Sequence, residues 1–252
     1  MTYCVAISVN SGIVFCSDSR TNAGVDQVST YSKMYKFDLG PERQFVILSA
    51  GNLATTQGTL RTLKKDIRED APISLKTVAN IGDAADYLGS VSCAEQKKHS
   101  SEGSVFEASF LLGGQISGGS HRVVMIYPEG NHITSSKDTP YLQIGESKYG
   151  KPILDRIINV DTTLDTSALC ALVSMDSTMQ SNLSVGPPIE LQVYHTDSFN
   201  LEHYIRFNED SEFLRDLKKS WDNRLKEAFR QLPPLAWANN WKAISDNNSG
   251  VY

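Results

Sequence analysis

The amino-acid sequence lacks the features that mark membrane, secreted and disulfide-rich proteins. Among its 252 residues no run of about 18 consecutive apolar residues occurs, so we expect no transmembrane helix. No basic segment precedes the first apolar stretch, as a secretory signal would require. The four cysteines, Cys4, Cys16, Cys93 and Cys170, form no CxxC pair. This scatter predicts reduced, mostly buried thiols in a cytoplasmic protein rather than a disulfide framework or a zinc site.

Basic charge is also scarce. The chain has 24 Lys and Arg residues against 29 Asp and Glu residues, a formal net charge of −5. Because nucleic-acid binding requires a basic surface, we expect no nucleic-acid partner. The five histidines include no HExxH motif and no pair spaced as i, i+4, and no GxGxxG or Walker motif occurs. From these absences we expect no metal site and no bound cofactor.

What the sequence does have is a regular order of strand and helix patterns. Apolar runs at 3–9 and 13–17 flank Asn10-Ser11-Gly12, which is typical of a β-hairpin. The polar segment 19–32 is either a loop or a weak second hairpin. Further strands are expected at 33–37, 45–50, 106–112, 121–127, 132–134, 141–144, 189–195 and 201–206. Helical spacing of apolar residues predicts helices at 52–70, at 75–96, from 145 onward, at 163–180 and at 211–231.

This order of elements predicts the fold class. Two stacked antiparallel sheets with a helix pair on each outer face would bury every apolar face, so we expect an α+β fold, a four-layer αββα sandwich. We expect one domain over residues 1–252, with a core at about 2–208 and a C-terminal helix and tail at about 209–252. This extension, with Trp237 and Trp241, packs either on its own domain or on another subunit.

Thr2 is the first candidate for chemistry. A small residue at position 2 favours removal of the initiator Met1, which would leave Thr2 with a free α-amine beside its hydroxyl. Such an amine has a pKa of about 7.7–8.0 and can accept the hydroxyl proton, which activates the oxygen as a nucleophile. The alternative is that Thr2 is an ordinary second residue. If Met1 is retained, the Thr2 nitrogen is part of a peptide bond and cannot act as the base.

Asp18, Lys33 and Gly51 are candidates to support such a nucleophile. A hairpin with its turn near Ser11 places residues 2 and 18 side by side, and Lys33 begins the next expected strand. An ammonium held there by the carboxylate would disfavour protonation of the α-amine, although an ordinary surface ion pair is the alternative. Gly51 ends a strand and opens a helix, so its N–H is a candidate oxyanion donor or simply part of a turn.

At these positions the chain resembles proteasome β-type subunits, the N-terminal-nucleophile hydrolases. The motifs that carry the resemblance are Thr2, Gly12, Ser17-Asp18-Ser19-Arg20, Ala23-Gly24, Ser29, Lys33, Ser49-Ala50-Gly51, Tyr127-Pro128-Glu129-Gly130, Ile144-Gly145-Glu146-Ser147 and Ser184-Val185-Gly186. The variants at 18–26, 51–57 and 181–186 are most similar to the bacterial ancestral β subunit, Anbu.

The resemblance implies a threonine peptidase with an αββα fold. By its pattern Thr2 is nucleophile and base, and Asp18 and Lys33 are the activating pair. Gly51 is the oxyanion donor. Supporting residues are Ser147, Ser184 and Arg20, and the specificity pocket is formed by Thr21, Ser49 and Leu53. The resemblance further implies a homo-oligomeric ring or helical assembly that acts on peptides or unfolded proteins. A separate ATPase partner, which this sequence does not identify, would have to supply energy-driven unfolding.

The chain also departs from the family pattern. Lys33 aligns only with a one-residue deletion in the preceding loop, and Lys36 is the second choice. The family's serine in its Gly-Ser-Gly turn is replaced here by Glu146 or Ser147, of which only Ser147 can donate a hydroxyl to the amine. Ser184 matches a second family serine, while Ser181 stands where the family has an aspartate, for which Asp176 is a candidate substitute.

Three functions therefore compete. The first is a threonine hydrolase that cleaves peptide bonds through an acyl-enzyme on Thr2. The second is a non-peptidase ring or scaffold with a weak or vestigial site, which the altered surroundings of the amine favour. The third is a small-amide hydrolase of the same nucleophile class, because one fold hosts several amide chemistries.

Overall fold

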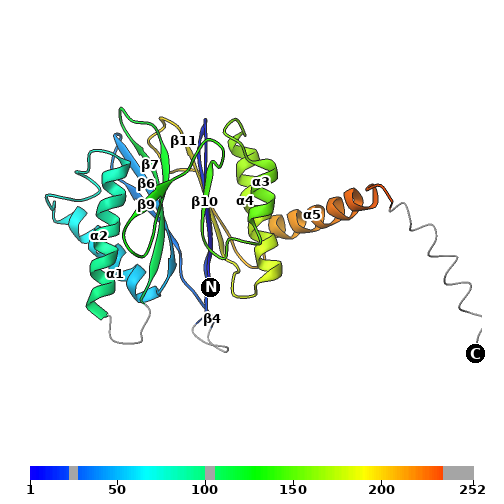
Figure 1. Ribbon diagram of the computed structural model, residues 1–252, viewed down its shortest axis with the longest axis horizontal. Coiled ribbons are helices and arrows are strands. Elements are labelled where there is room, and N and C mark those ends of the chain that lie inside the picture. The colour runs from blue at the N-terminus through cyan, green and yellow to red at the C-terminus, as the bar shows by residue number, and fades with distance from the viewer. Residues whose placement is uncertain (23–27, 100–105, 235–252) are drawn as a thin grey trace, which may run out of the picture. The chain divides into compact units, whose positions relative to one another are not determined.

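The structure is a computed structural model that describes residues 1–22, 28–99 and 106–234 (Figure 1). The chain divides into two compact units, Met1–Ser211 and Glu212–Tyr252. Positions 23–27 of the first family motif, Trp237 and Trp241 lie outside the described residues.

The first unit contains two five-stranded antiparallel sheets and a small hairpin among its described residues. One sheet has the order β10-β1-β2-β11-β12. Its strands are β1 (Tyr3–Val9), β2 (Gly12–Asp18), β10 (Tyr141–Gly145), β11 (Ile189–His195) and β12 (Tyr204–Phe207). The other has the order β5-β6-β7-β8-β9. Its strands are β5 (Met34–Asp38), β6 (Arg43–Gly51), β7 (Ala108–Ile116), β8 (Arg122–Ile126) and β9 (His132–Thr134).

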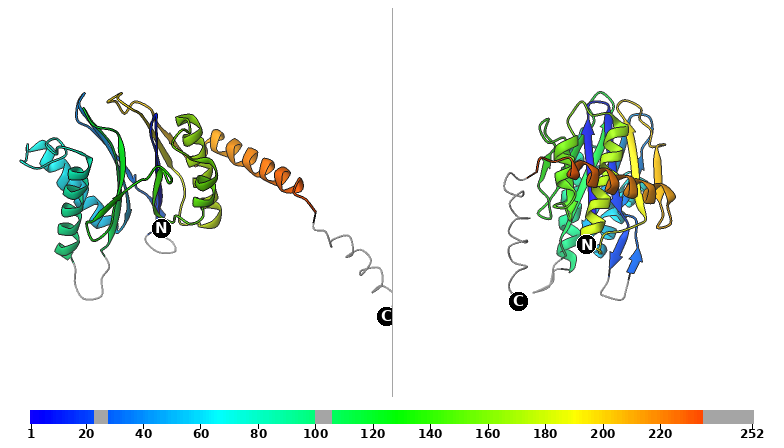
Figure 2. Two further views of the ribbon diagram at one scale, coloured as in Figure 1. Left: turned by 45° about the horizontal axis from the view of Figure 1, so that its top comes forward. Right: turned by 90° about the vertical axis from the view of Figure 1, so that its right-hand side faces the viewer.

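Two helices cover the outer face of each sheet (Figures 1 and 2). Helices α1 (Leu53–Arg68) and α2 (Ile81–His99) lie against the second sheet, and α3 (Lys151–Ile157) and α4 (Leu164–Ser181) lie on the first sheet's side. The predicted four-layer αββα sandwich is confirmed. One core fills the space between the sheets, with Phe15, Leu48 and Tyr194 among its buried members. A second core joins α1 and α2 to the second sheet.

Burial of both sheet faces explains the sequence pattern of the central strands. Strand β2 is buried at every residue and β1 at all but one, because one face meets the opposite sheet and the other lies beneath α4. Such strands appear as nearly continuous apolar runs rather than alternating ones. Within β2, polar residues occur only at its end, where Ser17 and Asp18 are fully shielded from water.

The structure corrects the starts of two helices and decides an open alternative. The helix expected from 145 onward begins at Lys151, because Gly145 still pairs with Tyr3 in the β1–β10 ladder. The helix expected at 75–96 begins at Ile81, because the Asn80 side chain accepts the Asp83 N–H at 3.0 Å and caps the helix there. Leu75 and Val78 are buried, as their apolar character suggests, but they lie in a preceding turn. Segment 19–32 contains a hairpin, in which β3 (Arg20–Asn22) pairs with β4 (Val28–Thr30).

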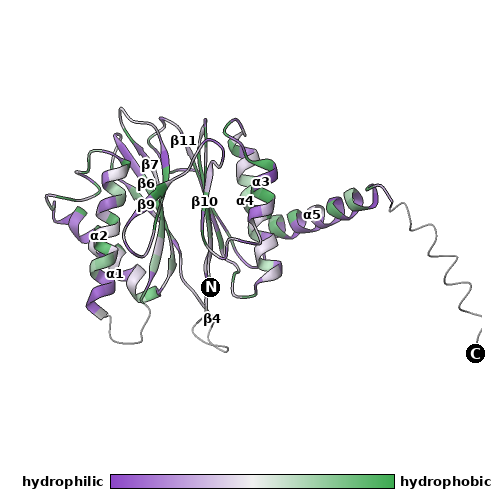
Figure 3. Ribbon diagram, viewed as in Figure 1, coloured by the Kyte–Doolittle hydropathy of each residue, from purple (hydrophilic) through white to green (hydrophobic). Residues whose placement is uncertain are grey.

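The second unit begins with helix α5 (Glu212–Arg230). Apolar side chains recur at Leu217, Trp221, Leu225 and Phe229, one every fourth residue, and the helix is coloured in alternating green and purple (Figure 3). This spacing makes α5 strongly amphipathic. None of the described helices is long and apolar enough to cross a membrane.

Candidate active site

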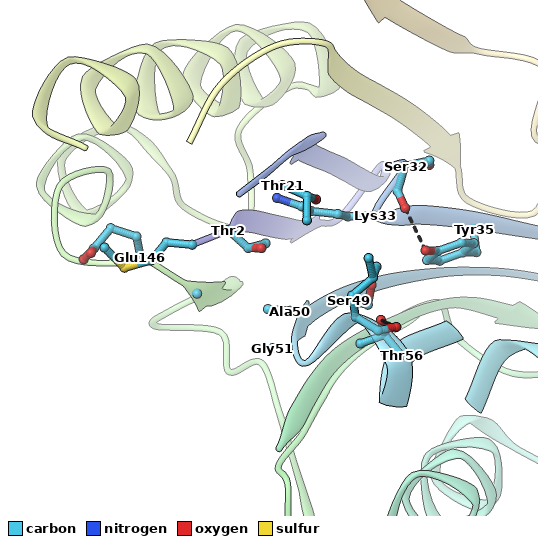
Figure 4. A pocket seen from close by; sticks show the side chains of 13 residues that line it. Thr2, Thr21, Ser32, Lys33, Tyr35, Ser49, Ala50, Gly51, Thr56 and Glu146 are labelled. Carbon is cyan, nitrogen blue, oxygen red and sulfur yellow. Dashed lines mark hydrogen bonds between the residues drawn. The ribbon is translucent and has the colours of Figure 1, made fainter. Parts of the chain in front are cut away.

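Six residues that the sequence singled out line one cavity of about 380 Å³ between the two sheets (Figure 4). They are Thr2, Thr21, Lys33, Ser49, Gly51 and Leu53. These residues come from the position just before β1, from β3, from the segment before β5, from the end of β6 and from the start of α1. The fold therefore brings the proposed nucleophile, cation, oxyanion donor and pocket residues to one place.

Thr2 is held by the neighbouring strand. Its carbonyl accepts the Glu146 N–H at 2.7 Å, which extends the β1–β10 ladder by one residue. Gly145 has φ +82°, and a Cβ there would lie 2.0 Å from the Thr2 oxygen. Only glycine fits this turn without moving Thr2. The position of the candidate nucleophile thus depends on Gly145 as well as on β1.

Asp18 and Lys33 form a buried ion pair rather than a surface one. Asp18 Oδ1 accepts the Lys33 Nζ at 2.7 Å and the Tyr3 N–H at 3.1 Å, and Oδ2 accepts the Gly186 N–H at 3.3 Å. Lys33 Nζ also donates to the Arg20 carbonyl at 2.7 Å. Burial raises the pKa of the Asp18 carboxyl, and the Lys33 ammonium opposes this rise.

Lys36, the alternative lysine, lies elsewhere. Its Nζ is 3.7 Å from the centroid of the Tyr204 ring, in a cation–π contact. Lys33, which precedes β5, is therefore the lysine that contacts Asp18. The one-residue deletion required by the family alignment agrees with this placement.

The Gly51 N–H is directed toward the cavity by the strand ladder. Ser49 donates its N–H to the Lys33 carbonyl at 3.0 Å, and N–H groups two residues apart on a strand point to the same edge. The β5–β6 register begins at Met34 opposite Leu48, so the Gly51 N–H lies beyond its end. On the opposite edge of β6, the Asn52 N–H, and not the Gly51 N–H, donates to the Glu107 carbonyl. The geometry fits a donor facing a substrate carbonyl.

The three supporting residues are not among those that line the cavity. Arg20 donates from Nη1 to the Leu183 carbonyl at 2.9 Å and from its backbone N–H to the Gly186 carbonyl at 3.2 Å. It thereby holds the turn whose Gly186 N–H reaches Asp18. The Ser184 N–H donates to Asn182 Oδ1 at 3.0 Å. At the other turn, Glu146 and not Ser147 lines the cavity.

Sequence reasoning missed several cavity residues, among them Tyr35 and Thr56. The Tyr35 hydroxyl donates to the Ser32 carbonyl at 2.7 Å, and the two residues lie together at one end of the cavity (Figure 4). Strand alternation could have found Tyr35, because it lies two residues after Lys33. Helical spacing could have found Thr56, because it lies one turn after Leu53.

Cysteine and metal chemistry are not evident at this site. Cys4 and Cys16 are free, buried thiols. Burial, with the nearby Asp18 carboxylate, raises the pKa of both. Among the described residues, no three His, Cys, Asp or Glu side chains are grouped to hold a metal ion.

Solved structures of one family match the chain over almost its whole length. Anbu (ancestral β-subunit) from Yersinia bercovieri is 47% identical with a TM-score of 0.89, and the match covers 92% of this chain and 98% of that one. The chain belongs to the Anbu family. A Gly-1 mutant of Anbu from Hyphomicrobium sp. strain MC1 is 40% identical with a TM-score of 0.89, over 93% of this chain and 99% of that one.

A further Anbu structure, titled as a helical assembly of the Anbu complex from Pseudomonas aeruginosa, is 43% identical with a TM-score of 0.89. The match covers 94% of this chain and 99% of that one. The resemblance to the proteasome-like Anbu fold is thus confirmed. No protein-family model matches the chain, and no curated protein does.

Proposed function

We propose that this member of the Anbu family is an N-terminal threonine hydrolase that cleaves peptide bonds through Thr2 after removal of Met1. The observation that carries the proposal is the cavity itself, which Thr2 shares with Lys33 and Gly51. The Lys33 ammonium is in turn fixed by the buried Asp18 carboxylate. Nucleophile, nearby cation and oxyanion donor are the parts that acyl transfer requires.

The proposed reaction begins with proton transfer from the Thr2 hydroxyl to its own α-amine, directly or through one water. The oxygen attacks the substrate carbonyl carbon, and the Gly51 N–H stabilises the negative charge that develops on the carbonyl oxygen. The α-ammonium then returns its proton to the leaving amine as the C–N bond breaks, which leaves an ester on Thr2. Water, deprotonated by the same α-amine, hydrolyses this ester and releases the acid.

Lys33 has an electrostatic role in this scheme. As an ammonium near the amine it disfavours a second positive charge, so the α-amine remains available as a base. Asp18 compensates the buried charge of Lys33 and fixes its Nζ by the 2.7 Å contact. Thr21, Ser49 and Leu53 then form a mixed wall of two hydroxyls and one apolar side chain for the substrate.

The proposal extends to assembly and substrate. The Pseudomonas aeruginosa relative is titled a helical assembly, and we propose a homo-oligomeric ring or helical assembly for this chain in the cytoplasm. Peptides or unfolded proteins are the proposed substrates. Folded substrates would depend on a separate ATPase.

Intact-mass spectrometry before and after a peptide vinyl sulfone tests the proposal. We expect loss of Met1 and one adduct, mapped by fragmentation to Thr2. Thr2→Ala is the matched control, because alanine is also small enough for Met1 removal but offers no hydroxyl. A free Thr2 that never reacts, or an adduct that persists in Thr2→Ala, would overturn the proposal.

One observation favours a second function, a non-peptidase assembly. Glu146 lines the cavity where the family pattern has a serine. An ionised carboxylate cannot donate a hydrogen bond to the free amine. If Thr2 does not react while the assembly forms, this function is preferred. Turnover of small amides but not of peptides would instead identify a small-amide hydrolase.

A further inference from the structure

Glu190 is a buried acid that the proposed reaction does not use. It lies on β11 opposite Ser17 of β2, with only 5% of its surface exposed. Its carboxylate accepts hydrogen bonds from three hydroxyl groups. Oε2 accepts Ser32 Oγ at 2.8 Å and Ser19 Oγ at 3.1 Å, and Oε1 accepts the Tyr204 hydroxyl at 2.6 Å.

Two of these donors are chain neighbours of the buried ion pair. Ser19 follows Asp18, and Ser32 precedes Lys33. The backbone around them is further joined by the Tyr31 N–H, which donates to the Ser19 carbonyl at 3.0 Å. A single carboxylate oxygen therefore binds both segments that carry the pair. Residues 31–33 belong to no regular strand, so their placement depends on these hydrogen bonds together with those that the Lys33 carbonyl and Nζ make.

The chemistry of a carboxylate suits this task. An ionised carboxylate only accepts hydrogen bonds and offers two oxygens, so it can satisfy three hydroxyl donors at once. An amide in the same place would present an NH₂ group to at least one donor. Among the described residues, no cation lies within ion-pair distance of Glu190. A buried charge held by hydroxyls alone is unfavourable for stability in itself, which points to a role in placing its partners.

We propose that Glu190 is a positioning residue that holds Asp18 and Lys33 in register through Ser19 and Ser32, an inference that rests on the proposed function. The contrasting interpretation is a purely structural link between β11 and β12 through Tyr204. The two interpretations differ in which hydroxyl matters. Positioning requires the Ser19 and Ser32 bonds at Oε2, whereas a structural link requires the Tyr204 bond at Oε1.

The kinetic test measures modification of Thr2 by a peptide vinyl sulfone, as a saturating rate constant and a half-saturating concentration. Glu190→Gln is expected to lower the rate constant roughly 10-fold to 100-fold, because misplacement of about 1 Å has effects of this size. The half-saturating concentration stays the same. Tyr204→Phe, the matched control, remains within about twofold of wild type, because it leaves both Oε2 bonds intact.

A second variant makes the test independent of any folding defect in Glu190→Gln. Ser32 is exposed, so Ser32→Ala is expected to fold, and it should lower the same rate constant. Ser32 Oγ also lies 2.9 Å from the Met34 carbonyl oxygen and accepts the Met34 N–H at 3.3 Å, so Ser32→Ala removes these contacts as well. Because Ser32→Ala and Glu190→Gln share the Ser32–Glu190 contact, the loss in the double variant should be smaller than the two single losses combined. Equal losses in Tyr204→Phe and Glu190→Gln, a change only in the half-saturating concentration, or additive losses in the double variant would overturn the proposal.

Amide hydrogen exchange separates this inference from the proposed function. Glu190→Gln should speed exchange of the Tyr31 N–H, and Tyr204→Phe should not. If wild-type Thr2 does not react at all, the proposed function fails, and the exchange result alone decides positioning. Unchanged exchange at Tyr31 in Glu190→Gln overturns the inference in either case.

Discussion

Lys33 Nζ lies 2.7 Å from Asp18 Oδ1, where the aspartate side chain has no contact with solvent and the lysine side chain is 8% exposed. Two opposite charges at this depth depend on each other, since either one alone would be buried without compensation. The pair also lies next to the cavity that Thr2 lines. Its stability and its proposed chemical role can therefore be tested with the same variants.

Lys33→Met should destabilise the fold by about 3–5 kcal/mol, because it leaves the Asp18 charge buried and unpaired. It should also abolish modification of Thr2. Lys36→Met is the matched control, since it removes only the exposed cation–π contact with Tyr204 and costs about 0.5–1 kcal/mol. Denaturant unfolding and mass spectrometry measure the two effects. Normal Thr2 reactivity in Lys33→Met would remove Lys33 from the proposed mechanism.

Gly51→Ala should damage the site more than the fold as a whole. Gly51 has φ +109°, and a Cβ would lie 2.4 Å from the Glu107 carbonyl oxygen, so the backbone must shift. Gly40→Ala is the control, because Gly40 has φ +93° but nothing within 4 Å of an added Cβ. Gly40→Ala carries only the conformational cost, about 1–2 kcal/mol. We expect lost Thr2 reactivity in Gly51→Ala alone; equal reactivity of the two variants would contradict the oxyanion role.

The buried cysteines should not react with thiol reagents in the folded protein. Burial raises the pKa of Cys4 and Cys16, and it raises that of Cys170 to about 12. Because a raised pKa keeps the thiol protonated, the reactive thiolate is scarce at about pH 8. Cys93, which is only partly buried, should be alkylated first by iodoacetamide. Cys93→Ser should then show no fast alkylation; rapid modification of Cys4 would contradict its burial.

Much of the fold was predictable because its strands are long apolar runs with clear turns between them. The strands at 132–134 and 189–195 have the predicted bounds. The start of α2 was wrong because Leu75 and Val78 keep helical spacing in a turn that ends at the Asn80 cap. Apolar spacing reports burial, and it does not report which backbone hydrogen bonds form.

The candidate site was predictable only in part, and the roles of its residues stay predictions. The hairpin register brings the start of β1 beside Asp18, which local sequence could suggest. The partners of Glu190 lie in three other segments, up to 171 residues away, so no local pattern could reveal them. The choice between Glu146 and Ser147 depended on a turn with φ +82° at Gly145. Gly145 lies so close to Thr2 that an added Cβ would be 2.0 Å from the Thr2 carbonyl oxygen, and no local sequence pattern reports this contact.

Glu146 lines the same cavity as Thr2. Its carboxylate accepts the Asn182 amide at 3.1 Å, and Lys148 Nζ lies 3.7 Å away on its exposed side. A carboxylate on this wall favours the protonated form of the freed α-amine, which cannot act as a base. Glu146→Ser should therefore speed Thr2 modification at about pH 7, where an ordinary α-amine is mostly protonated.

The acceleration should fade at about pH 9, because the amine is then deprotonated with or without the carboxylate. Glu129→Ser is the matched control, since it makes the same change of charge at an exposed turn that is not part of the cavity. Labelling rates measured across this pH range for the three proteins distinguish the outcomes. An acceleration that is equal at both pH values would mean that Glu146 acts by steric hindrance. A slower Glu146→Ser would mean that the carboxylate assists the amine, and the case for a vestigial site would lose its structural support.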